Sequence, residues 1–296
     1  SPMPAQATSI TLGLPAETNY HEAFELPVTL DNASTPGSGD IGYGPYVDLF
    51  IPPTVEGVPA SADYLGLSLA PIQTFTWDAT LQDWSPALDP DARVHPLSRF
   101  DDPANANAIL PPDGAVLGLA DGTEWRVYQL PFGSFTPEQP EAKLTFAGAT
   151  LDSTQAKIQA QGGYIFGDTP TGSNGPIRTS TVSEANVEAR IYKLTKELDA
   201  PESETATGAN FPVIYTLTVD VDQDVQITNL VINDTLPDEF QFLGIESITA
   251  PSGTTVTTVT SPDPADTSTI PPDADTYEID SLCFSIDQFT GASCSS

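Results

Sequence analysis

The sequence predicts an all-β protein built from two β-sandwich domains in tandem, Ig-like or jelly-roll-like in type. Three observations support this. Short stretches rich in β-branched residues alternate between apolar and polar side chains, which is the pattern of half-buried strands. The 29 prolines and 21 glycines indicate many turns and few long helices. Hydrophobic residues make up 39% of the 296 positions, which is enough to form cores in two domains of ordinary size.

The N-terminal half reads as short strands separated by turns. Residues 8–14 and 24–30 alternate, residues 31–40 form a loop, and the apolar strand 46–51 stops at two prolines, which cannot donate to a ladder. Further strands are predicted within 65–77, over 115–119 and 124–130 around an Asp-Gly turn, and over 143–151 and 156–166. Residues 84–112 lack periodicity, and a stretch this long without regular structure is usually functional or mobile.

The domain boundary is expected near Arg190, within residues 179–198, which read as an extended connector. The predicted domains are therefore 1–189, a larger β-sandwich, and 190–296, a smaller one. In the second domain strands are predicted over 211–219 and 227–232, from Phe240 onward, within 245–259 and over 277–289. This is about one strand fewer than a seven-stranded sandwich needs. Either the chain is the N-terminal piece of a longer protein, or a neighbouring chain supplies the last strand.

The second domain resembles a known family in three segments: VIYTLTV at 213–219, ITNLVI at 227–232 and DTLP at 234–237. Together they resemble the DUF11-type repeat of bacterial cell-surface proteins, which is related to the isopeptide-forming Ig-like modules of adhesins and pili. The resemblance covers the last third of the chain. It implies an Ig-type fold and a role as an adhesin or surface repeat.

The resemblance also raises an intramolecular isopeptide bond. Residues 191–199 (IYKLTKELD) resemble the strand that carries the reacting lysine, which Lys196 matches, and Asp234 could serve as the assisting acid. No asparagine follows Asn233, so the usual partner is missing. Surface ion pairs are the expected role of Lys193 and Lys196 instead.

The net charge of −32, from 41 acidic and nine basic residues, excludes nucleic acid as a partner, because phosphate recognition needs Lys and Arg. It also argues against an anionic membrane surface, and no window approaches the roughly 18 apolar residues of a membrane span. The acids could bind Ca²⁺, keep a surface protein soluble and extended, or suit a saline habitat.

Calcium is the cofactor that the sequence suggests. Asp220, Asp222 and Asp224 have a spacing that can aim several oxygens at one ion, although Val225 and Val231 exclude an EF-hand. A second candidate group surrounds the first loop and consists of Asp31, Asp40 and Asp48. A third lies in the irregular stretch and consists of Asp89, Asp91, Asp101 and Asp102.

Other candidate residues serve binding or covalent chemistry. Tyr43 and Tyr46, in a predicted loop, could stack on sugar rings, as could Trp77, Trp84 and Trp125, although a place in the core is the alternative for each. Cys283 and Cys294 lie close in sequence and favour a disulfide in an extracellular chain over two free thiols. Asn32 and Asn233 begin the glycosylation pattern N-x-S/T.

Catalysis has little support, because neither His21 nor His95 has metal-like or triad-like spacing, and no nucleophile elbow or phosphate loop occurs. The prediction is a non-catalytic, extracellular structural module of adhesin type, whose partners are other surface domains or subunits and glycans. One alternative is a subunit of an extracellular filament completed by strand exchange. The other is a carbohydrate-binding module or glycosidase, since a glycosidase needs only two carboxylates.

Overall fold

The computed structural model describes residues 7–88, 93–105, 107–131, 133–166, 177–199, 214–221, 230–235, 245–250, 255–261 and 281–287. The chain divides into two compact units, Ser1–Ile191 (unit 1) and Tyr192–Ser296 (unit 2). The boundary predicted from the sequence lies between residues 189 and 190. The all-β prediction is confirmed, because one short helix, α1 (Gly114–Leu117), accompanies the strands of the described residues.

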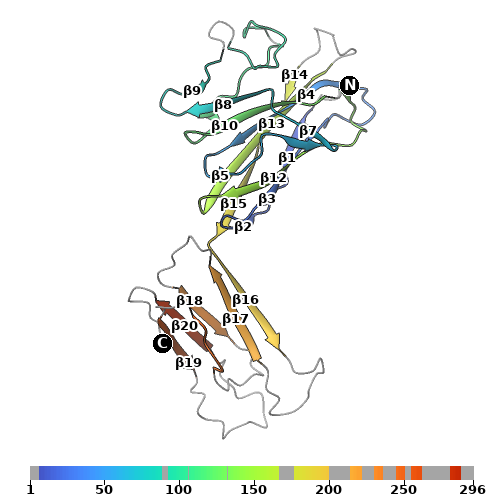
Figure 1. The fold of residues 1–296 in the computed structure, drawn as a ribbon. Helices are drawn as coiled ribbons and strands as arrows, with labels where there is room; N and C mark the ends of the chain where they lie inside the picture. Colours follow the sequence, from blue (N-terminus) through green and yellow to red (C-terminus); the bar gives the residue numbers. More distant parts are fainter. Residues whose placement is uncertain are drawn as a thin grey trace. The chain divides into compact units, whose positions relative to one another are not determined.

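Unit 1 contains two sheets (Figure 1). The six-stranded sheet has the order β1 (Ser9–Leu12), β3 (Phe24–Asp31), β12 (Ala142–Leu151), β6 (Ala62–Tyr64) and β7 (Leu67–Leu69), with β5 (Val55–Glu56) paired to β12. The nine-stranded sheet has the order β2 (Glu17–Asn19), β15 (Ser183–Arg190), β13 (Gln155–Phe166), β4 (Gly42–Ile51), β10 (Glu124–Gln129), β8 (Gln73–Asp78) and β9 (Asp83–Ser85). There β11 (Ser134–Phe135) pairs with β4, and β14 (Ile177–Thr179) pairs with β13. The β2–β15 pair is parallel and the other pairs are antiparallel.

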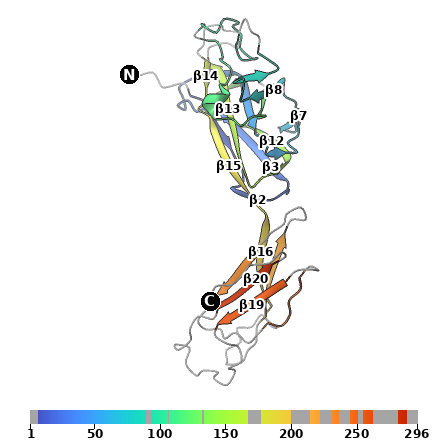
Figure 2. The same ribbon diagram turned by 90° about the vertical axis from the view of Figure 1, so that its left-hand side faces the viewer.

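The main core of unit 1 lies between these two sheets. In β3 the alternation predicted from sequence buries Phe24, Leu26, Val28 and Leu30 on one face. Residues of β13 and β15 belong to the same cluster. In Figure 2 these two strands lie on one side of unit 1, and β3 and β12 lie on the other. Burying an aliphatic side chain of this size stabilises the fold by about 1.5–3 kcal/mol, so the two sheets hold each other.

A second core covers the outer face of the nine-stranded sheet. Every residue of β4 except Gly44 is buried, because the main core lies on one face of the strand and the described residues between 93 and 119 lie over the other. We call residues 93–119 the strap. The buried members of this second cluster are Phe50, Phe75, Trp77, Trp84, Leu88, Trp125 and Val127, with Leu97, Leu117 and Leu119 packed against them.

The strap corrects one predicted strand. Residues 115–119 were expected to form one arm of a hairpin, but α1 occupies this stretch. Asp113 caps the helix by accepting the N–H groups of Ala115 and Val116, and Gly118 ends it in the left-handed conformation at φ 65°. A Cβ at Gly114 would lie 2.5 Å from the Trp77 ring, so only glycine allows the helix to rest on that indole. A four-residue helix is too short to produce a periodic signal.

Residues 179–198 were predicted to be an extended connector between the domains, but most of them belong to sheets. The first residue of this segment, Thr179, ends β14, and residues 183–190 form β15 inside the nine-stranded sheet, where Val187 and Ala189 are buried. Its last part is β16 (Tyr192–Asp199), which belongs to unit 2.

The described residues of unit 2 form two small sheets. The strand β16 pairs antiparallel with β17 (Ile214–Val221), and a three-stranded sheet has the order β18 (Leu230–Thr235), β20 (Ser281–Asp287), β19 (Thr255–Ser261) (Figure 1). The strands predicted over 211–219, 227–232 and 277–289 are confirmed in their described parts. No helix of the described residues has the length and apolar character needed to cross a membrane.

Candidate functional site

The most elaborate polar arrangement of the described residues surrounds Asp48, at the centre of β4. The Asp48 side chain is fully buried on the face that the strap covers. Its Oδ1 accepts hydrogen bonds from Trp125 Nε1 at 2.8 Å and His95 Nε2 at 2.9 Å, and its Oδ2 accepts one from Gln161 Nε2 at 3.0 Å. These donors come from β10, the strap and β13, so three different segments meet at one carboxylate. We call these four residues the Asp48 cluster.

The hydrogen bonds fix the proton of His95. The backbone N–H of Leu97 donates to His95 Nδ1 at 3.1 Å, so that nitrogen carries the lone pair. The proton therefore lies on Nε2, which donates to Asp48. With 1% of the residue exposed and both ring nitrogens bonded, His95 has no free nitrogen for acid–base chemistry in this arrangement.

The Asp48 charge also acts on Tyr46, which lies two residues earlier on the same face of β4. Burial and then the nearby Asp48 carboxylate raise the pKa of the Tyr46 hydroxyl well above its usual range. That hydroxyl is 2.9 Å from Thr179 Oγ1, and its ring lies 5.0 Å from the His95 ring. A buried carboxylate is tolerated only when donors satisfy it, and here three N–H groups do so.

Further bonds attach the strap to the sheet. Trp84 Nε1 donates to the carbonyl of Pro112 at 2.9 Å, and Gln159 Nε2 donates to the carbonyl of Leu117 at 3.2 Å. Within the strap, His95 N–H donates to the carbonyl of Ile109 at 2.8 Å. The Asp48 cluster is thus one of several polar fastenings that hold the strap over the aromatic core.

The sequence did not predict that the other three members of this cluster lie next to Asp48. His95, Trp125 and Gln161 lie 47, 77 and 113 positions from Asp48, so no local spacing links them. One signal was present: Asp48 interrupts an otherwise apolar strand, and a carboxylate in that position needs buried donors from elsewhere in the chain.

The second predicted calcium group, Asp31, Asp40 and Asp48, is not brought together around Asp48. Asp31 lies at the end of β3 in the other sheet, and its pKa is raised by burial and by the nearby Glu141 carboxylate. A cation at Asp48 would have to displace three N–H donors, so Asp48 does not fit the predicted site. Asp40 lies at the end of the first loop, where its carbonyl accepts Asn32 Nδ2 at 3.0 Å. Within the described residues, no three His, Cys, Asp or Glu side chains are grouped so that they could hold a metal ion.

The other predicted metal and disulfide residues are described only in part. Asp220 is exposed in β17, whereas Asp222 and Asp224 lie outside the described residues. Asp101 and Asp102 are exposed in the strap, and Asp89 and Asp91 lie outside the described residues. Cys283 is in β20, and Cys294 lies outside the described residues.

The predicted position of the sugar-stacking tyrosines is wrong. Tyr43 and Tyr46 lie in β4 and not in a loop, with 8% and 1% of each residue exposed. The strand begins earlier than expected because β11 and β13 both pair with its first residues. Trp77, Trp84 and Trp125 are also buried, in the second core, which was the alternative for each of them.

Unit 2 contains the second notable polar contact, between Lys196 of β16 and Asp234 of β18. Lys196 Nζ lies 2.7 Å from Asp234 Oδ1, and 34% of the lysine side chain and 11% of the aspartate side chain are exposed. The ammonium also lies 4.4 Å from the centre of the Tyr215 ring, a favourable cation–π distance. The pair joins the two sheets of unit 2, and it brings together the two residues that the family resemblance suggested.

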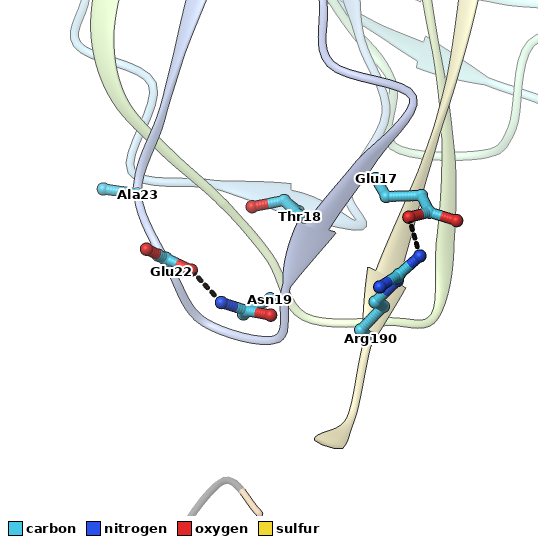
Figure 3. Close-up of a pocket in the computed structure, with 6 residues that line it drawn as sticks. All are labelled: Glu17, Thr18, Asn19, Glu22, Ala23 and Arg190. Atoms are coloured by element: carbon cyan, nitrogen blue, oxygen red, sulfur yellow. Dashed lines mark hydrogen bonds and ion pairs between the residues drawn. The ribbon is translucent and has the colours of Figure 1, made fainter. Parts of the chain in front are cut away.

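A polar hollow lies between β2 and the end of β15 (Figure 3). It is lined by Glu17, Thr18, Asn19, Glu22, Ala23 and Arg190. Its polar groups pair with one another, Glu17 with Arg190 and Asn19 with Glu22. The hollow is open and its ion pair is exposed, so these contacts add little stability and suggest no chemistry.

No known protein family and no curated protein sequence matches this chain. The resemblance to the DUF11-type repeat therefore stays an expectation. Two solved structures are among those similar to it. AvmM, which catalyses macrocyclization in alchivemycin A biosynthesis, is 15% identical with a TM-score of 0.27, over 62% of this chain and 88% of AvmM. The full-length major pilin SpaD of Corynebacterium diphtheriae is 12% identical with a TM-score of 0.25, over 64% of this chain and 36% of SpaD. At these TM-scores neither match carries an argument.

Proposed function

We propose that this chain is a non-catalytic structural module of an extracellular or cell-surface protein. The observation that carries the proposal is how the chain uses its buried polar groups. The Asp48 cluster joins the strap to two strands of a sheet, and the Lys196–Asp234 pair joins the two sheets of unit 2. In both places the polar atoms bond to one another and fasten separate elements.

This use of polar groups suits a mechanical role more than a chemical one. A general base needs a free lone pair, and both nitrogens of His95 are occupied. A buried carboxylate that accepts three N–H groups strongly favours one arrangement of its donors, since moving any donor away leaves a polar group unsatisfied. Such contacts resist local unfolding. This property suits a module that is exposed to proteases or to mechanical force.

The charge distribution supports an exposed location. The last basic residue of the chain is Lys196, and the hundred residues after it contain no Lys, Arg or His. A surface this acidic repels like molecules and stays soluble at the outside of a cell. Its partners would be neighbouring domains or subunits of the same surface assembly.

Antibodies raised against the folded chain test this function on intact cells of the source organism. We expect labelling without permeabilisation, and loss of the label after protease treatment of the intact cells. An antibody to a cytoplasmic protein serves as the control for lysis. Labelling that occurs only after permeabilisation would refute the extracellular role.

A filament subunit is the second candidate, and one observation favours it. On the face of β16 that carries Lys196, Leu194 and Leu198 are 47% and 54% exposed, and Tyr192 is 44% exposed. Apolar side chains on the face of a sheet are usually covered by the layer opposite, and a strand from a neighbouring copy, added to the edge of that opposite sheet, would extend the cover. The prediction is assembly that grows with concentration in sedimentation and is weakened by Leu198→Glu. Leu110→Glu, at an exposed leucine of unit 1, is the matched control. A monomer at every concentration would argue against the filament.

A further inference from the structure

The chain contains two N-x-S/T sequences, beginning at Asn32 and Asn233, and the structure places them in opposite environments. Asn32 lies directly after β3 and is 2% exposed, whereas Asn233 lies in β18 with its residue exposed. An enzyme that attaches a sugar to asparagine must reach the side-chain amide nitrogen. The two sequences are therefore distinguished by access to that atom.

The Asn32 amide is fully used inside unit 1. Its Nδ2 donates to the carbonyls of Asp40 at 3.0 Å and Phe135 at 2.8 Å, and its Oδ1 accepts the N–H of Ser34 at 3.2 Å. Ser34, the hydroxyl residue of the same sequence, is 3% exposed, and its Oγ accepts the N–H of Ala7 at 3.1 Å. A sugar on Nδ2 would replace one of two bonded hydrogens and would need space that the fold does not provide.

Asn233 has the opposite setting. Its neighbours Ile232 and Asp234 are 8% and 9% exposed, and Asp234 turns toward Lys196 of the other sheet. Because successive side chains of a strand point to opposite faces, Asn233 points away from that contact. Val231, which shares the outward face, is 41% exposed. A sugar at Asn233 therefore leaves the Lys196–Asp234 pair intact and adds its bulk on the open side of β18.

We propose that Asn233 is an acceptor site for an N-linked glycan and that Asn32 is not. In the reaction, Asn233 Nδ2 forms a bond to the anomeric carbon of an activated sugar. The phosphate or nucleotide group of that donor leaves with its bonding electrons, and the amide loses one proton to the transferase. This property is independent of the proposed structural role, so either could fail without the other.

The test uses the folded full-length chain, a soluble transferase that glucosylates N-x-S/T sequences, and UDP-glucose. Synthetic peptides covering 27–39 and 228–240 serve as unfolded references. We expect one hexose on the folded chain, at Asn233, and complete loss of it in Asn233→Gln and in Thr235→Val. Ser34→Ala, in the buried sequence, is the matched control and should keep the hexose. Sites are mapped with a protease specific for acidic residues, because trypsin has no target after Lys196.

Two results would overturn the inference. One is an unmodified Asn233 in the folded chain, whether or not the 228–240 peptide accepts the sugar. The other is a hexose on Asn32 in the folded chain, which would mean that burial and hydrogen bonding do not protect that amide. Modification of both peptides together with Asn233 alone in the folded chain would establish that the fold selects the site.

Discussion

At the scale of single residues, the Asp48 carboxylate is the group that matters most for the stability of unit 1. It is fully buried and has three N–H donors, and removing one partner from such an arrangement leaves the others unsatisfied. The expected consequence is a loss of stability and not a loss of chemistry. Two substitutions at this position separate charge from hydrogen bonding.

We expect Asp48→Ala to lower the free energy of unfolding of unit 1 by about 3–5 kcal/mol, because it leaves three buried donors without an acceptor. Asp48→Asn should cost clearly less, since the amide oxygen still accepts from His95 and Trp125 and the Gln161 amide can turn its oxygen to the new N–H. Urea denaturation followed by tryptophan fluorescence measures both. Glu188→Ala, which removes an exposed carboxylate from the same sheet, should change stability by less than about 0.5 kcal/mol. Equal effects of Asp48→Ala and Glu188→Ala would contradict this assignment.

The Lys196–Asp234 pair makes a second prediction at this scale. Lys196→Met should destabilise unit 2 by about 1–3 kcal/mol, because Asp234, 9% exposed, loses its cation. Adding Asp234→Leu should recover most of that loss, since a buried ion pair can be replaced by apolar residues. Lys193→Met is the control, because Lys193 is exposed on the other face of β16. Thermal melts of the four chains decide the matter, and the idea fails if Lys196→Met is as harmless as the control.

The same pair decides whether the isopeptide suggestion applies here. An ion pair leaves the mass of the chain unchanged, whereas an isopeptide bond between Lys196 and an asparagine, with Asp234 as the assisting acid, would lower it by one ammonia. We expect the unchanged intact mass, in agreement with the missing asparagine partner.

At the scale of elements, the strap is the feature that distinguishes unit 1 from a plain two-sheet sandwich. It converts the outer face of the nine-stranded sheet into a second core of aromatic residues. Its helix α1 rests on Trp77 only because residue 114 is glycine. The position of that helix is therefore tested by adding one methyl group.

We expect Gly114→Ala to destabilise unit 1 by about 1–3 kcal/mol, because the new Cβ would lie 2.5 Å from the Trp77 ring. A loss of stability would be informative, because helix propensity alone favours alanine over glycine by about 1 kcal/mol and would stabilise the variant. Val116→Ala is the control in the same helix, where the valine is 83% exposed and should be nearly neutral. A stabilised Gly114→Ala chain would mean that α1 does not pack on Trp77.

The burial of each strand explains which strands could be predicted from the sequence. Strands such as β3 and β10 follow from alternation, because one face is buried and the other is not. The start of β4 was not predicted as a strand for two reasons. It is covered on both faces and therefore does not alternate, and it contains Gly and Pro, which are typical of loops. The site depends on contacts over 47 to 113 positions, which no local pattern contains.

At the scale of the whole molecule, the net charge of −32 governs behaviour in solution. Mutual repulsion of the acids opposes the compact state, and salt screens exposed charges over a Debye length of about 10 Å at 0.1 M. Stability should therefore rise with ionic strength. Calcium binding by Asp220, Asp222 and Asp224 stays a prediction.

Melting temperatures in NaCl and in Ca²⁺ at matched ionic strength separate screening from a specific site. We expect a gradual rise with NaCl. A specific site would add about 2.7 kcal/mol when Ca²⁺ is 100 times its Kd. Mg²⁺ is the control ion, and Asp222→Asn should remove the extra rise. Identical curves for Ca²⁺ and Mg²⁺ would remove calcium from this account.

Hydrogen exchange of the backbone amides in the wild-type chain and in Asp48→Ala, which removes the acceptor of all three hydrogen bonds, is the most direct test of the claim that the Asp48 cluster holds the strap on the sheet. The account predicts faster exchange of the strap amides that depend on it, including Leu97 and His95, while β3 and β12 in the other sheet keep their protection. Unchanged protection of the strap in Asp48→Ala would contradict the claim, because the strap would then be held without the carboxylate.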